Sequence, residues 1–101
     1  MILAEVDGEK VNSKATLIAE LARALRFPDY FGGSWDAVSD CLQDLSWLGN
    51  ISSLLVVFSN VDHLEKAICS DFHVLLDVLH GAAQVWESQG FDFSVVLAEG
   101  K

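Results

Sequence analysis

The stretch SLLVVFS, Ser53 to Ser59, places five apolar residues in a row between two serines. A short apolar run rich in β-branched and aromatic residues is typical of a strand that is buried on both faces. Two further apolar stretches, at 1–7 and 91–98, are also predicted to be strands, and helical patterns separate each of them from 53–59. Because strands joined through helices pair in parallel with right-handed crossovers, the sequence predicts an α/β fold with a three-stranded parallel sheet.

About four helices are expected to pack against this sheet, because apolar residues recur at helical spacing in four segments. The expected helices cover about 13–27, 34–45, 62–68 and 70–90. The side chains that can cap the first three are Asn12 or Ser13, Ser34, and Asp62, and Ser70 or Asp71 opens the fourth. Gly81 interrupts the fourth pattern and argues against its continuity, whereas Gly90 fits a C-terminal stop.

The composition is typical of one globular domain spanning 1–101, since 51% of the 101 residues are apolar and 21% are charged. Fifteen acidic and six basic residues give a net charge of −9. Nucleic acid and anionic membranes are therefore not expected as direct partners, because both need a cationic surface. A basic protein partner is compatible with this charge, and so is an acidic surface that serves solubility alone.

The two cysteines, Cys41 and Cys69, form no CxxC motif and are expected to be buried free thiols. No histidine cluster has the spacing of metal ligands, so neither a metal nor a cofactor is expected. The first ten residues lack the basic and apolar segments of a secretory signal. No apolar run approaches the roughly 20 residues of a membrane span, so that a cytoplasmic location is expected.

The helix expected at 34–45 carries its charges on one side. At about 100° per residue, one side is apolar and the other holds Asp36, Ser39, Asp40, Gln43 and Asp44. This spacing makes two like-charged pairs at i,i+4, Asp36 with Asp40 and Asp40 with Asp44. Each pair destabilises an isolated helix by about 0.2–0.5 kcal/mol. No basic residue occurs between Arg26 and Lys66 to neutralise them locally. A solvated polar face accounts for this pattern, and so does a docking face for an arginine-rich cleft, because arginine pairs with carboxylates bidentately.

Three aromatic residues border this helix: Tyr30 before it, Trp35 at its start and Trp47 after its end. Tyrosine and tryptophan are frequent anchors of protein interfaces. For Trp35, packing in the core is the favoured interpretation. For Tyr30 and Trp47, partner binding and packing are both open.

The segment FPDYFGGSWDAVSDCL, Phe27 to Leu42, resembles the signature segment of the barstar family, the cytoplasmic inhibitors of barnase-type ribonucleases. The shared pattern is a proline, an acidic residue, two aromatics and a glycine, then a helix with Asp-Ala, a two-residue spacer and Asp-Cys-Leu. The spacing matches without a gap. ILAEVDGEKVNS and GFDFSVVLAE resemble the first and last strands of the family, so a barstar-like fold is implied for the whole chain.

The resemblance implies an inhibitor that does no chemistry, and hence not an enzyme. In the family, two helix aspartates enter the ribonuclease active site and meet the cations that otherwise hold substrate phosphate. By position these are Asp36 and Asp40, with Asp40 the more deeply inserted, and Tyr30 matches a contact aromatic. Further positions on the contact face and its C-terminal end are Ser34, Trp35, Ser39, Gln43 and Asp44. The implied partner is a basic extracellular or toxin ribonuclease, bound by a protein that is monomeric when free.

Three departures from the family pattern point to a partner other than barnase itself, such as a related toxin nuclease. Ser39 stands where well-known members have a large aromatic residue. The family's additional acidic contact on the last helix has no clear counterpart, and Glu87 is the one weak candidate. Cys69 does not match the family's second cysteine.

Three other functions compete with inhibition. An enzyme that uses Asp36 and Asp40 as an acid/base pair is disfavoured, because two aspartates one turn apart on an exposed helix enclose nothing and no nucleophile motif accompanies them. A metal site is disfavoured because Asp36 and Asp44 lie about 12 Å apart along the helix axis. An acidic adaptor that binds another basic protein stays open as the alternative.

Overall fold

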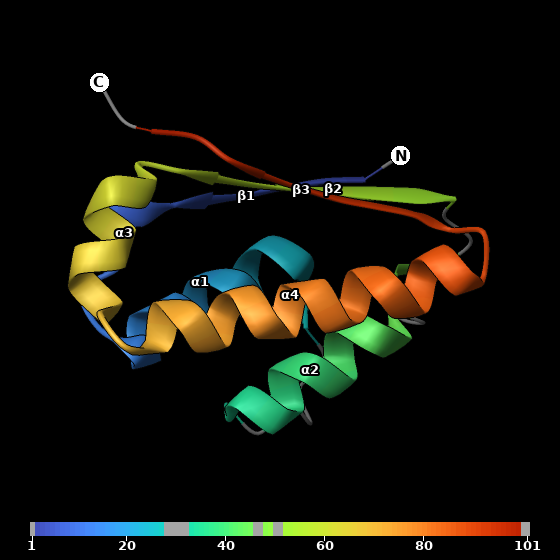
Figure 1. Cartoon of the computed structure of the whole chain (residues 1–101), viewed down its shortest axis with the longest axis horizontal. Coiled ribbons are helices and arrows are strands. Elements are labelled where there is room, and N and C mark those ends of the chain that lie inside the picture. Colours follow the sequence, from blue (N-terminus) through green and yellow to red (C-terminus); the bar gives the residue numbers. More distant parts are fainter. Residues whose placement is uncertain (1, 28–32, 46–47, 50–51, 100–101) are drawn as a thin grey trace.

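The computed structural model describes residues 2–27, 33–45, 48–49 and 52–99. Within these ranges, three strands form one sheet and four α-helices flank it (Figure 1). The strands are β1 (Ile2–Asp7), β2 (Ser53–Ser59) and β3 (Asp92–Leu97); the helices are α1 (Lys14–Leu25), α2 (Trp35–Asp44), α3 (Val61–Ile68) and α4 (Asp71–Ser88); a 3₁₀ turn, η1, covers Gly8–Lys10. The predicted α/β fold, a three-stranded parallel sheet packed by four helices, is confirmed.

The central strand of the sheet is β2, which pairs in parallel with β1 on one side and with β3 on the other. Val56 of β2 lies opposite Ala4 and Val95. Because the strands follow one another across the sheet in chain order, right-handed crossovers bring the connecting helices to the same face. Figure 1 shows α1, α2 and α4 below the sheet and α3 at one end.

The prediction that Ser53–Ser59 is buried on both faces is wrong. Leu54, Val56 and Phe58 point toward the helices and are fully buried, but the residues between them are only half-buried. On the same uncovered face, Leu3 of β1 and Val96 of β3 are 51% and 44% exposed. The run is apolar on both faces, yet helices cover one of them.

The core lies between the covered face of the sheet and the apolar sides of the helices. In α1 these are Leu17, Ile18, Leu21 and Leu25, all buried. The helix starts with a capping box, since the Thr16 N–H donates to Ser13 Oγ and the Ser13 N–H donates to Thr16 Oγ1 at 3.0 Å. Of the two predicted caps, Ser13 is therefore the N-cap residue.

The junction between β2 and α3 differs from the prediction that Asp62 caps the third helix. The helix begins at Val61, and its N-cap residue Asn60 has a left-handed φ of 52° and makes no capping bond with its side chain. Instead, Asn60 Nδ2 donates to Asp7 Oδ1 at 2.8 Å, and the Glu9 N–H donates to the same oxygen at 3.0 Å. Both hydrogen bonds lower the pKa of Asp7, and the bond from Asn60 connects the ends of β1 and β2.

The helix α4 runs through Gly81 without a break, over 18 residues. A Cβ at Gly81 would meet nothing within 4 Å, so the glycine marks neither a close contact nor a kink. The predicted stop is confirmed, because Gly90 follows the helix with a φ of 75°. None of the helices in the described ranges is both long enough and apolar enough to span a membrane.

Candidate partner-binding site

The start and the end of α2 follow from its local sequence. The Ala37 N–H donates to Ser34 Oγ at 3.1 Å, which makes Ser34 the N-cap residue. Leu45 ends the helix with a left-handed φ of 54°. The buried side consists of Val38, Cys41, Leu42 and Leu45, as the helical spacing predicts.

A contact from α4 holds the C-terminal half of α2. The indole Nε1 of Trp86 donates to the Leu42 carbonyl oxygen at 2.7 Å, and its ring packs against Phe91 with centroids 4.7 Å apart. The two residues of this bond are 44 positions apart in sequence. This role of Trp86 is not predictable from the sequence, because a tryptophan on an apolar helix side gives no sign of a carbonyl partner.

Replacing Trp86 with phenylalanine is expected to lower the free energy of unfolding by about 1 kcal/mol, which is the net value of one hydrogen bond, with some loss of packing added. The Leu42 carbonyl then loses its donor while the aromatic contact with Phe91 is largely kept. Urea denaturation measures the change. An unaltered midpoint would show that this bond does not stabilise the fold.

Asp36 and Asp40 lie on the side of α2 that faces away from the core, and both are exposed. In the part of the chain that the structure describes, neither forms an ion pair. Arg23 pairs instead with Glu20 at 3.1 Å. The two carboxylates are one helical turn apart, about 6 Å along the axis, and Asp44 is exposed one turn further on.

The other predicted contact residues are spread around this acidic face. Ser34 and Gln43 are exposed, and Ser39 is half-buried and accepts a hydrogen bond from Gln43 Nε2 at 3.3 Å. Trp35 is half-buried and packs against the core, in agreement with the favoured interpretation. Tyr30 and Trp47 lie outside the described residues, as does the rest of the signature segment between Phe27 and Gly33.

The prediction that both cysteines are buried is correct for Cys41 and wrong for Cys69, which is exposed. Burial raises the pKa of the Cys41 thiol, and the nearby Asp44 and Asp40 raise it further. A raised pKa leaves less thiolate at a given pH.

At mildly alkaline pH, iodoacetamide is therefore expected to alkylate Cys41 at least about tenfold more slowly than Cys69. Peptide mass mapping over time measures both rates, and equal rates would contradict the burial of Cys41.

The geometry of α2 suits binding to a protein rather than catalysis within the chain. Within the described ranges, no three side chains of His, Cys, Asp or Glu are placed to hold a metal ion. The histidines lie on other helices, His63 on α3 and His73 and His80 on α4. An exposed helix with two carboxylates in fixed positions can accept hydrogen bonds from a cationic cleft that fits over it.

A search of individual characterised proteins found no significant match to this chain. Among protein families, the model described as Barstar (barnase inhibitor) matches residues 1–98. The match covers all three strands and all four helices described above, including the acidic helix α2. It agrees with the resemblance seen in the segment around α2. The chain therefore belongs to the barstar family of barnase inhibitors.

Proposed function

We propose that this protein is a cytoplasmic immunity protein that blocks the basic active site of a barnase-like ribonuclease or a related toxin nuclease with α2. The observation that carries the proposal is the exposure of Asp36 and Asp40 on one rigid helix. Neither carboxylate has an ion-pair partner among the described residues. Both are therefore available to a cationic partner.

Charge mimicry is the physical basis of this inhibition. A ribonuclease holds its substrate through cations that bind phosphate, and a carboxylate pairs with the same arginine and lysine side chains. Because α2 is already capped and packed, its backbone needs no further ordering when the carboxylates bind a partner. The net charge of −9 speeds the encounter with a basic enzyme.

The proposed interface has Asp40 at its centre and Asp36 beside it. The surrounding contacts are Ser34, Trp35, Ser39, Gln43 and Asp44, with Tyr30 and Trp47 on the flanking segments. The small side chain of Ser39 leaves room that a large aromatic residue fills in well-known family members. A partner with a bulkier loop than barnase at this point fits that difference.

Inhibition of RNA hydrolysis tests the proposal. The purified protein is titrated against barnase and against any small basic nuclease encoded beside its own gene, and sedimentation measures the mass of the complex. We expect a monomer when free, a one-to-one complex with the cognate enzyme, and loss of hydrolysis at one equivalent. Binding to a basic protein without loss of hydrolysis would favour the acidic adaptor instead.

A further inference from the structure

The strand β3 forms an edge of the sheet. Its Asp92 N–H donates to the Ser52 carbonyl, and the Ala98 amide just beyond the strand donates to Phe58 of β2 at 2.8 Å. Since successive N–H groups along a strand point to opposite edges, those of Phe93, Val95 and Leu97 point away from β2. In the described part of the chain no other strand pairs with β3, so this edge offers unpaired donors and acceptors.

Apart from Asp92 at its start, this edge lacks the usual protection against pairing in the part of the chain that the structure describes. Natural edge strands carry an inward-pointing charge, a proline, a bulge or a covering loop. From Phe93 to Leu97 the sequence is FSVVL, with neither charge nor proline, and its register with β2 is regular. Val96 and Leu97 are 44% and 43% exposed. Such an edge is suited to the addition of an extended strand.

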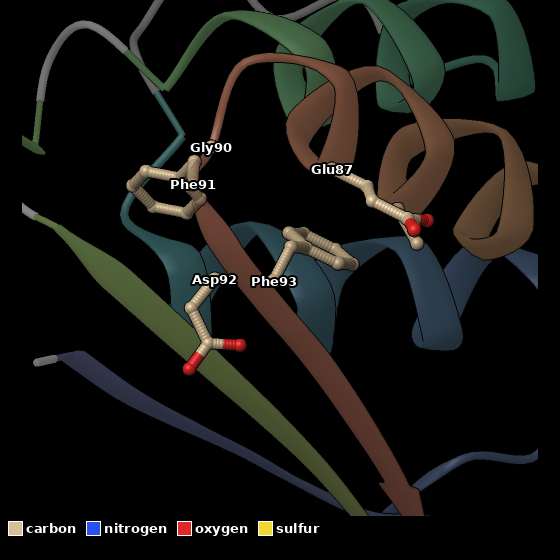
Figure 2. A pocket seen from close by; sticks show the side chains of 6 residues that line it. Glu87, Gly90, Phe91, Asp92 and Phe93 are labelled. Carbon is tan, nitrogen blue, oxygen red and sulfur yellow. The ribbon is translucent and has the colours of Figure 1, made fainter.

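A shallow pocket of about 340 Å³ lies where this edge begins, between α4 and β3. Its lining combines carboxylates and aromatic rings: Ala83, Glu87, Gly90, Phe91, Asp92 and Phe93. Figure 2 shows Glu87 extending from α4 on the side of Phe93, while Asp92 lies across the strand. A strand added here would have Asp92 toward one face and Glu87 toward the other. On the α4 side, a lysine or arginine side chain fits Glu87 and the ring of Phe93.

This surface is separate from the acidic face of α2. Ala83 and Glu87 line the pocket beside β3, whereas the indole of Trp86 bonds to Leu42 of α2. The helix α4 thus has one side against α2 and another beside the open edge. Glu87, the weak candidate for the family's additional acidic contact, lines this pocket; the inference below otherwise does not depend on the function proposed for α2.

We propose that the free edge of β3 binds an extended, basic segment of another protein by strand addition, with a lysine or arginine beside Glu87 and Phe93 in the pocket. A second copy of this chain fits poorly. Each copy carries a net charge of −9, so two copies repel one another, whereas a basic segment is attracted to the acidic protein.

Nuclear magnetic resonance on the full ¹⁵N-labelled chain tests this with an acetylated, amidated heptapeptide in which lysine alternates with valine. We expect saturable shifts of the Phe93, Val95 and Leu97 amides, with slower exchange of their protons with solvent. A peptide with proline in place of valine has the same charge but cannot pair as a strand, and we expect it to leave these amides unchanged. Equal binding of both peptides would overturn the proposal, as would shifts confined to α2.

Two charge variants test the pocket. Glu87→Gln is expected to weaken binding of the lysine–valine peptide by about 1.5- to 5-fold, the size expected for an exposed ion pair. Asp92→Asn removes a carboxylate from the other face of the strand and should weaken binding less. Glu65→Gln, which removes an exposed carboxylate from α3, is the control and should leave the affinity unchanged. Equal weakening by all three variants would show only general attraction and overturn the pocket's role. Shifts at the β3 edge that depend on protein concentration without peptide would identify a second copy as the occupant, which would also overturn the proposal.

Discussion

Replacing Asp40 with alanine is expected to weaken binding to the cognate ribonuclease by about 2–5 kcal/mol, a range borrowed from the barnase–barstar pair itself rather than derived from this chain. The dissociation constant rises by about 30- to 5,000-fold in consequence. The physical reason is that the enzyme's cations would stay buried in the interface without their carboxylate partner. Surface plasmon resonance or calorimetry measures the change. An unaltered affinity would contradict the assignment of Asp40 to the centre of the interface.

Matched variants separate this effect from a general loss of charge. Asp36→Ala is expected to weaken binding next most, and Asp44→Ala to slow mainly the association rate, because rim charges act chiefly through steering. Glu65→Ala removes a carboxylate from α3, on another part of the molecule (Figure 1). It should change the affinity little. A loss as large as that of Asp40→Ala would show that net charge alone governs binding.

The same Asp40 variant should fold at least as stably as the parent protein. Asp40 has like-charged neighbours at i−4 and i+4, and removing it relieves about 0.2–0.5 kcal/mol for each pair. Alanine also has the higher helix propensity. A thermal midpoint equal to or above that of the parent, together with weakened binding, would assign Asp40 to function rather than to the fold.

Replacing Gly8 with alanine is expected to lower the free energy of unfolding by about 2–3 kcal/mol, as overpacking of a well-packed site does. Gly8 is buried between β1 and the start of α3. An added Cβ would clash with the Asn60 carbonyl oxygen and lie 2.7 Å from the Ser59 oxygen and 3.0 Å from the Leu64 Cβ. Two of these atoms belong to the backbone and cannot rotate away. Urea denaturation of the purified variant measures the loss.

Gly81→Ala provides the matched control for this substitution. A Cβ at Gly81 would meet nothing within 4 Å, and the residue lies inside α4. Alanine is favoured over glycine in a helix by about 0.5–1 kcal/mol, so this variant should be more stable than the parent. If Gly81→Ala also destabilised the protein, the clash of the added Cβ at Gly8 would not explain the destabilisation by Gly8→Ala.

Much of the fold was predictable because its signals are local. The apolar run at 53–59 identified the central strand, and the caps Ser13 and Ser34 identified two helix starts correctly. The N-cap of the third helix was misplaced by two residues, at Asp62 instead of Asn60. Asn60 adopts a left-handed conformation there, and its side chain donates a hydrogen bond to Asp7. That bond joins residues 53 positions apart, and no local pattern reports such a partner.

The candidate site was predictable in outline for the same reason. The spacing of Asp36 and Asp40 puts them on the polar side of a helix, and the structure leaves both exposed. Their lack of ion pairs within the described ranges could not be deduced from the sequence, since Lys or Arg from another element might have reached them. Trp86, which bonds to Leu42, was likewise visible only in three dimensions.

Residue spacing alone predicted the order of strands and helices and the apolar and acidic sides of α2, because each depends on neighbours within a few turns of the chain. The family came from the resemblance of Phe27 to Leu42 to the barstar signature, and the family model confirms it. Tertiary structure decided what covers each surface. It left one face of β2 without helices, although the strand is apolar on both. It also left the outer edge of β3 unpaired in the described part of the chain. The reason is that burial depends on which distant segments pack together, and right-handed crossovers between strands in chain order placed the helices on a single side.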